Sequence, residues 1–192
     1  TGNKLMRMLR SRAQANPKSI VFAEADHLDV LKAAQIVHDD GIGKPILLGN
    51  KEIIKELMEE LNFEANLPII DPKSSKEKKR RNHFAKIYFE KHQRKGITLL
   101  DAQKWMRERN YFAAMMVNEG EADSLVTGYS RSYPTVAKPM IELIGKAKGV
   151  ERVAATNIMM TDRGPMFFSD TAFNINPNEQ ELAQIARMTN RV

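Results

Sequence analysis

The sequence predicts an α/β fold, a doubly wound three-layer α/β/α domain with a mostly parallel sheet, followed by the start of a second α/β domain. Short apolar runs typical of buried strands alternate with helical segments, and such alternation favours parallel strands joined by crossover helices. The 192 residues can also bury a sizeable core. We expect a leading helix or linker at residues 1–18, the first α/β domain at 19–145, and an incomplete part of a second at 146–192.

The first domain is predicted to contain four strands, each followed by one or more helices. The apolar runs that indicate strands lie at residues 19–25, 44–50, 67–71 and 123–128. Periodic apolar residues indicate helices at 4–15, 27–40, 51–61, 75–93, 98–106, 110–118 and 134–144. Asn50 is expected to cap the helix that begins at Lys51. Because parallel strands end at the same edge, ligands tend to bind in the crevice there.

The pattern changes after Gly149. Two apolar runs, 150–160 and 165–173, are joined by Thr161-Asp162-Arg163-Gly164, which is typical of a hairpin turn. A capped amphipathic helix comes next, within 176–192. Two strands and one helix make a poor independent core. Since the chain also begins with Thr1 rather than Met, we expect either trimmed termini or a piece of a longer protein. We also expect the unfinished second domain to pair with another copy.

Composition excludes several classes of site. No cysteine is present, so a disulfide scaffold, a thiolate metal site and a cysteine nucleophile are excluded, and a cytoplasmic location is expected. No apolar run is long enough to span a bilayer, which predicts no membrane partner. The formal charge of +6 suggests anionic partners. The run 73–81, "KSSKEKKRR", contains Glu77 and no aromatic residue, so it predicts a solvated helix face rather than a nucleic-acid interface.

The stretch "DSLVTGYSRSYP" at residues 123–134 carries the sharpest candidate site. Hydroxyls, amide N–H groups and a guanidinium at a strand–turn–helix junction are well suited to hold a phosphate or carboxylate. The residues of this cluster are Thr127, Gly128, Ser130, Arg131 and Ser132. The alternative is a plain junction in which Ser132 caps the helix opened by Pro134. The pattern is neither a Walker loop nor a Gly-x-Gly-x-x-Gly fingerprint.

Other polar residues come directly after strands and have two interpretations. Glu24, Asp26 and His27 are candidate acid–base groups, although Asp26 is better suited to cap the next helix. The second-domain candidates for ligand contacts are Thr156, Asn157, Asp170 and Asn174, and each could equally satisfy local backbone groups.

The remaining distinctive residues are expected to be structural. His38, His83 and His92 have no partner at metal-ligand spacing, so no metal site is predicted. Trp105 and the pairs Met115-Met116 and Met159-Met160 are expected in the core.

Three segments together resemble the phosphate acetyl/butyryl transferase family. The segment at 95–145, "KGITLLDAQKWMRERN…RSYPTVAKPMIELIG", resembles its signature region. "GVERVAATNIMM" with "PMFFSDTAFNINPNEQELAQIA" resembles the next stretch of the same family, and "VFAEADHLDVLKAAQIVHDDGIGKPILLGN" resembles its N-terminal βαβ unit. The resemblance implies two α/β domains with a cleft between them, a dimer, and interconversion of acyl-CoA plus phosphate with acyl phosphate plus CoA. It also implies a longer chain, part of which carries catalytic groups and part of which returns to the first domain.

The chain departs from the transferase pattern of Ser-Gly-x-x-His-Thr-Thr and a later Arg-Pro. Arg131-Ser132 replaces His-Thr, Tyr133 replaces the second Thr, and Lys138 replaces the Arg, a change that removes a bidentate phosphate ligand. The form "SRSYP" resembles the transferase-like C-terminal domain fused to bacterial malic enzymes. That resemblance implies a regulatory, oligomerising domain that binds acetyl-CoA without catalysing transfer. It also implies that NADP and a divalent metal bind only in the malic enzyme part.

Two functions therefore remain open from the sequence. The first is an acetyl-CoA-binding regulatory module with no catalytic residue and no cofactor of its own, in which Thr127, Ser130, Arg131, Ser132 and Lys138 line the anionic end of the ligand. The second is an active phosphate acetyltransferase in which the same residues hold acyl phosphate. A nucleic-acid binder would rest on net charge alone.

Overall fold

The computed structural model describes residues 2–191, which form two compact units. One unit comprises Ser11–Gly145, and the other comprises residues 2–10 together with residues 146–191. Helix α1 (Gly2–Ala15) contributes residues to both. No helix among the described residues has the length and apolar character needed to cross a membrane. The domain limits expected from the sequence stay a prediction.

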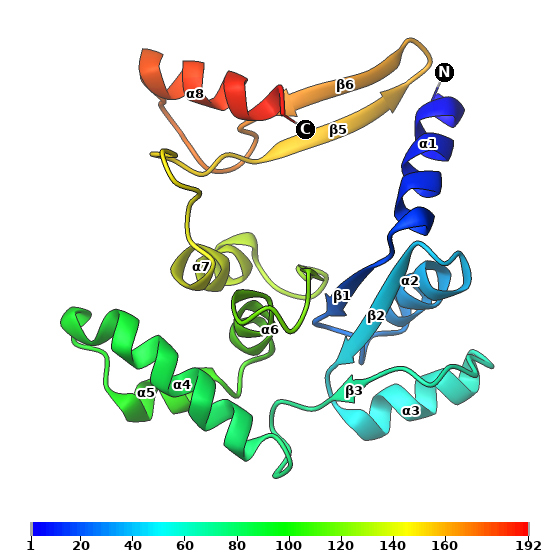
Figure 1. Cartoon of the computed structure of the whole chain (residues 1–192), viewed down its shortest axis with the longest axis vertical. Coiled ribbons are helices and arrows are strands. Elements are labelled where there is room, and N and C mark those ends of the chain that lie inside the picture. The colour runs from blue at the N-terminus through cyan, green and yellow to red at the C-terminus, as the bar shows by residue number, and fades with distance from the viewer. Residues whose placement is uncertain (1, 192) are drawn as a thin grey trace. The chain divides into compact units, whose positions relative to one another are not determined.

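A four-stranded parallel sheet forms the centre of the larger unit (Figure 1). Its strands are β1 (Lys18–Phe22), β2 (Gly43–Leu48), β3 (Ile69–Ile70) and β4 (Ser124–Val126). They are ordered β3-β2-β1-β4, so the chain runs outward from β1 on one side and returns to pair with it on the other. The mixed α/β fold with a parallel sheet is confirmed.

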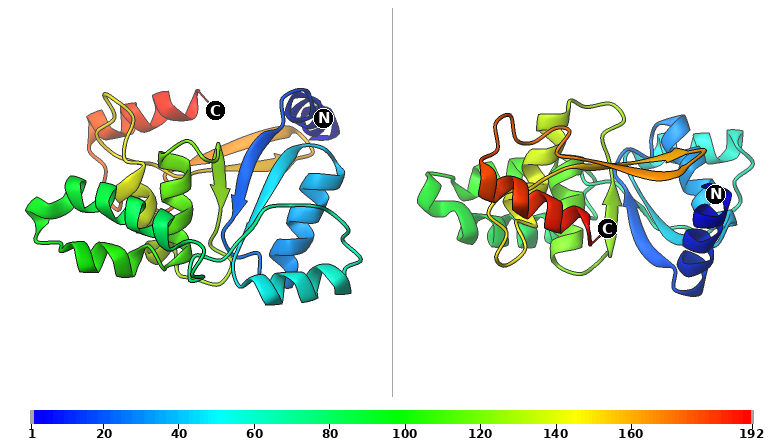
Figure 2. Two further views of the ribbon diagram at one scale, coloured as in Figure 1. Left: turned by 60° about the horizontal axis from the view of Figure 1, so that its bottom comes forward. Right: turned by 90° about the horizontal axis from the view of Figure 1, so that it is seen from above.

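Helices cover both faces of this sheet (Figure 2). Alternate strand residues supply the two cores, because successive side chains point to opposite faces. Phe22 and Leu47 pack with α2 (Leu28–Asp39) and α3 (Lys51–Glu60). Val21 and Leu48 pack with the other layer, which consists of α4 (Lys78–His92), the 3₁₀ turn η1 (Gln93–Lys95), α5 (Leu99–Trp105), α6 (Arg109–Asn118) and α7 (Tyr133–Leu143).

The elements begin and end within a few residues of the predicted limits. Asn50 caps α3 as predicted, since its side chain accepts from the N–H groups of Glu52 (3.0 Å) and Ile53 (3.2 Å). Helix α4 starts three residues later than predicted, and it is preceded by a turn in which Asp71 accepts from the N–H groups of Lys73 and Ser74.

The smaller unit contains an antiparallel hairpin and one helix. Strands β5 (Thr156–Thr161) and β6 (Gly164–Ser169) pair from Thr156–Ser169 to the turn, as the hairpin signal predicts. Helix α8 (Glu179–Thr189) contacts β6 and is capped by Asn178.

One core prediction holds and one is wrong. Met115 and Met116 are buried in the α6 core, and Trp105 is partly buried against it. Met159 and Met160 are 54% and 41% exposed, because the residues of a two-stranded ribbon point to both faces and α8 covers little of it.

Candidate functional site

The loop after β4 closes around a carboxylate of the chain itself. Glu24 Oε1 accepts from the N–H groups of Gly128 (2.7 Å) and Tyr129 (3.0 Å). Glu24 Oε2 accepts from the N–H (2.8 Å) and the hydroxyl (2.5 Å) of Ser130. The Thr127 hydroxyl lies between Glu24 Oε1 (3.2 Å) and Asn110 Oδ1 (2.7 Å). The donors predicted to hold an anion are therefore together, and Glu24 occupies them.

This arrangement keeps Glu24 ionised although it is only 1% exposed. Burial alone would raise its pKa, but the hydrogen bonds from Ser130, Gly128 and Tyr129 outweigh that effect and lower the pKa to about 2. A carboxylate with this pKa is a poor proton acceptor near neutral pH. Glu24 therefore acts as a structural anion rather than as the acid–base group considered from the sequence.

Local sequence explains the shape of the loop. Gly128 has φ +106°, a conformation that favours glycine, and it directs consecutive N–H groups to one carboxylate. Tyr129 leaves the loop toward α2, where its hydroxyl donates to Asp29 (2.6 Å) and its ring contacts His27.

The residues after the loop begin α7. Ser132 stands at the N-cap position, but its hydroxyl bonds the Thr135 hydroxyl (2.9 Å) rather than a helix N–H. Lys138, one turn further, lies 3.9 Å from the Glu142 carboxylate.

Glu142 is held in turn by two tyrosine hydroxyls. Tyr88 (2.9 Å) and Tyr111 (3.1 Å) both donate to Glu142 Oε2. Burial, together with the neighbouring carboxylate, raises the pKa of both tyrosines, so they remain donors. This network fixes the carboxylate that faces Lys138.

Asp26 does not cap α2 as expected. The N-cap residue is His27, whose side chain makes no capping bond, and Asp26 forms a bidentate pair with Arg109 (2.6 and 3.0 Å). A second contact, from Asn50 N–H, lies at 3.4 Å. The correction has a physical reason, since a guanidinium fork is a stronger partner for a carboxylate than a single helix N–H.

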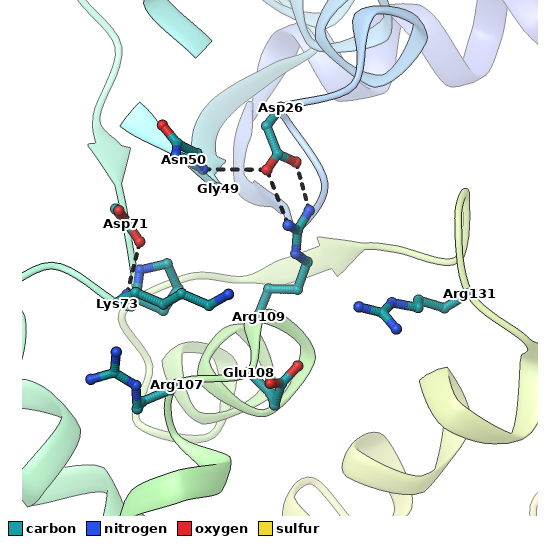
Figure 3. Close-up of a pocket in the computed structure, with 10 residues that line it drawn as sticks. Asp26, Gly49, Asn50, Asp71, Lys73, Arg107, Glu108, Arg109 and Arg131 are labelled. Atoms are coloured by element: carbon teal, nitrogen blue, oxygen red, sulfur yellow. Dashed lines mark hydrogen bonds and ion pairs between the residues drawn. The ribbon is translucent and has the colours of Figure 1, made fainter. Parts of the chain in front are cut away.

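A polar pocket of about 150 Å³ lies at the carboxyl edge of the sheet (Figure 3). Asp26, Asn50 and Asp71, which come after β1, β2 and β3, line it together with Lys73 and Arg107. Arg131 and Lys73 approach it from opposite sides, with Arg109 between them (Figure 3). This is the edge at which the parallel fold predicts a ligand crevice.

Sequence reasoning named Arg131 but missed the other cations of this pocket. Lys73 belongs to a run interpreted as a solvated face, and Arg107 and Arg109 stand between two helices without a motif. Their place after strand β3 and at the start of α6 is the only signal that could have indicated them. Arg131 is exposed and forms no ion pair with another described residue, so its charge is available to a ligand.

The four second-domain candidates lie in the smaller unit and make local bonds. Thr156 contacts Ser169 across the hairpin (3.4 Å), and Asn157 donates to Thr171 (3.2 Å). Asp170 accepts from the backbone and side chain of Asn174 (3.2 and 3.0 Å). Their role as ligand contacts stays a prediction. Within the described residues no group of His, Asp or Glu has a metal-binding arrangement.

The chain is similar to phosphotransacetylases and to malic enzymes. It is 34% identical to "Phosphate acetyltransferase" of Thermoanaerobacterium thermosaccharolyticum, covering 95% of this chain and 56% of that protein. It is 32% identical to "NADP-dependent malic enzyme" of Haemophilus influenzae, covering 95% of this chain and 24% of that protein. The chain thus spans between about a quarter and just over half the length of these relatives.

Solved structures give the same result. The crystal structure of a phosphotransacetylase from Streptococcus pyogenes superposes with a TM-score of 0.83 at 32% identity, covering 96% of this chain and 56% of that one. The family model described as Phosphate acetyl/butaryl transferase matches residues 4–192. The chain therefore belongs to the Phosphate acetyl/butaryl transferase family.

Proposed function

We propose that this chain is a phosphotransacetylase-like regulatory and oligomerisation domain of an NADP-dependent malic enzyme. It binds acetyl-CoA or a related acyl or phosphate ligand and does not catalyse acyl transfer. NADP and a divalent metal would bind only in the malic enzyme part of the longer protein. The assembly is at least a dimer, with neither a nucleic acid nor a membrane as partner.

The occupation of the 127–130 loop by Glu24 is the observation that carries this proposal. Catalysis of acyl transfer needs free donors aimed at the developing oxyanion. Here the N–H groups of Gly128, Tyr129 and Ser130 already bond Glu24. Arg131, directly after the loop, is left to present its charge to the pocket, which supports binding of an anion rather than stabilisation of a transition state.

Similarity to malic enzymes adds support. "NADP-dependent malic enzyme" of Haemophilus influenzae is matched over 95% of this chain yet only 24% of its own length. A region of that proportion suits a domain fused to a larger enzyme. Regulation would then require acetyl-CoA to favour one arrangement of the assembly, with a coupling of roughly 1–3 kcal/mol.

An active phosphate acetyltransferase is the second candidate. The 34% identity to the Thermoanaerobacterium thermosaccharolyticum phosphate acetyltransferase favours it. In that case Arg131 and Lys138 would hold acyl phosphate, and the catalytic groups absent from this region would lie elsewhere in the protein.

Two assays on the full-length protein separate the candidates. Malate-dependent NADP reduction is measured with and without acetyl-CoA, and acetyl phosphate formation is measured from acetyl-CoA and phosphate. Malate oxidation that responds to acetyl-CoA, without acetyl phosphate, is the expected result. Acetyl phosphate formation without malate oxidation would overturn the proposal in favour of the transferase.

Arg131→Ala tests the binding site itself. Acetyl-CoA affinity should fall about tenfold or more, because a charge-assisted contact is lost, while the melting temperature hardly changes. Arg94→Ala, which removes an exposed arginine from η1, is the matched control. Equal affinities of the two variants would remove Arg131 from the site.

A further inference from the structure

A second basic groove lies beside the pocket at the sheet edge. It has a volume of about 450 Å³ and runs between the start of α4 and helix α5. Its cationic lining residues are Lys73, Lys78, Arg81, Lys104 and Arg107, and no carboxylate lines it. The neighbouring pocket is different, because Asp26, Asp71 and Glu108 contribute negative charge there.

Arg81 fixes one wall of the groove. It is 8% exposed, and its guanidinium donates to the backbone carbonyls of Pro72 and Ser74 (both 2.6 Å). These bonds hold the segment that carries Lys73 against α4. Burial, followed by the nearby positive charge of Arg107, lowers the pKa of Arg81, although the carboxylates of Glu77 and Asp71 act in the opposite direction. Arg81 and Arg107 therefore lie close enough for their charges to interact.

The other four cations are available to a ligand. Lys73, Lys78, Lys104 and Arg107 are exposed, and among the described residues none has a carboxylate at ion-pair distance. By contrast Arg80, the neighbour of Arg81, pairs with both Glu77 and Glu121. Arg80 is therefore neutralised by carboxylates, whereas these four cations of the groove are not.

The rest of the lining indicates a small organic ligand. Asn82 and Gln103, whose side chains lie 3.5 Å apart across the two helices, offer amide groups. Leu100 is 61% exposed and supplies an apolar surface. A volume of this size suits a small molecule. Four free cations suit a ligand with more than one phosphate, and the absence of aromatic lining residues disfavours stacking of nucleic-acid bases.

We propose that this groove binds a small nucleotide carrying two or more phosphate groups, with Lys73, Lys78, Lys104 and Arg107 holding the phosphates. Lys73 and Arg107 also line the pocket at the sheet edge, so the two hollows share cations. The same chemistry is offered by a nucleoside diphosphate and by the adenosine diphosphate part of CoA. With CoA as the ligand, the inference rests on the acetyl-CoA binding proposed above; with a separate nucleotide, it does not.

The test is calorimetric titration of the full-length protein with ADP, with CoA and with inorganic phosphate. The variant Lys78→Gln/Lys104→Gln removes two cations that line only the groove, and Lys32→Gln/Lys55→Gln removes two exposed cations from α2 and α3 as a control of equal charge. We expect ADP to bind more tightly than inorganic phosphate, and its affinity to fall at least tenfold in the groove variant only.

The titrations also distinguish the source of the nucleotide and show which results would contradict the proposal. Loss of both ADP and CoA affinity in the groove variant supports the proposal with CoA as the source, and loss of ADP affinity alone supports it with a separate nucleotide. Equal ADP affinity in both variants, or no binding of either nucleotide at millimolar concentration, would overturn it. Tighter binding of a short oligonucleotide than of ADP would overturn it in favour of nucleic acid. Arg131→Ala tests the proposed function separately, because Arg131 does not line the groove.

Discussion

Glu24 and Ser130 are 106 positions apart in the sequence, yet Ser130 donates both its N–H and its hydroxyl to one oxygen of the Glu24 carboxylate, at 2.8 and 2.5 Å. The contact joins the end of β1 to the loop after β4. Because Gly128 and Tyr129 bond the other oxygen, the carboxylate acts as a fixed centre around which the loop is built.

Glu24→Gln should destabilise the fold. The amide replaces an acceptor oxygen with an NH₂ group that faces N–H donors, so buried donors lose their partner. We expect a loss of about 2–4 kcal/mol, which corresponds to a fall of roughly 5–15 °C in Tm. Thermal unfolding followed by circular dichroism measures it. Glu64→Gln, at an exposed carboxylate, should leave Tm within about 1 °C. A similar Tm for both variants would show that the loop does not depend on Glu24.

The contribution of the ionised Glu24 carboxylate should also appear in the pH dependence of the free energy of unfolding. The folded-state pKa of Glu24 is about 2, below its ordinary value of 4.5. Its contribution is therefore present above pH 4.5 and is lost as the pH falls toward 2, to a total of about 3 kcal/mol. Urea unfolding of the wild type and Glu24→Gln between pH 6 and 2.5 should show their free energies of unfolding converging as the pH falls. Parallel curves would contradict the pKa.

Asp26 and Arg109 should be energetically coupled. Their bidentate pair is partly buried, so a double-mutant cycle with Asp26→Ala and Arg109→Ala should give about 1–2 kcal/mol of coupling. The same cycle for Lys86 and Glu90, an exposed pair at 3.9 Å, should give at most about 0.5 kcal/mol. If the two couplings match, the geometry of the first pair contributes nothing.

The two methionine pairs should respond differently to truncation. Met115→Ala removes a fully buried side chain and should cost about 2–5 kcal/mol. Met159→Ala, at a position that is 54% exposed, should change the free energy of unfolding by about 0.5 kcal/mol or less. Chemical denaturation of both variants checks this. A large loss at Met159 would indicate that the hairpin is covered in solution.

Local signals explain which features could be predicted from the sequence. The Asn50 cap depends on N–H groups two and three residues away, so sequence spacing alone indicates it. The parallel sheet could also be predicted, because the alternation of strands and helices is visible in the order of short segments along the chain. The family resemblance likewise depended on contiguous segments, and the match of the family model over residues 4–192 confirms it.

Contacts between distant residues account for the features that could not be predicted. The sequence pattern indicates Thr127, Gly128 and Ser130 as neighbouring hydrogen-bond donors. No local pattern shows that their acceptor is Glu24, about a hundred residues earlier. Asp26 stands in the sequence where an N-cap residue is expected. Its actual partner, Arg109, lies 83 positions away, so no local pattern indicates the pair. The basic run at 73–81 resembled a uniform solvated face, and only the fold shows that Arg81 turns inward to bond Pro72 and Ser74.

The order of the sheet has a consequence for biosynthesis. β1 is a central strand, and one of its partners, β4, comes about a hundred residues later, as the bond between Ser19 and Asp123 shows, which spans 104 positions. At a translation rate of about 5–20 residues per second, that partner emerges roughly 5–20 s after β1. During this interval the nascent chain can pair β1 with β2 but leaves its other edge open. The edge of β1 that β4 later covers therefore stays unpaired in the nascent chain for several seconds.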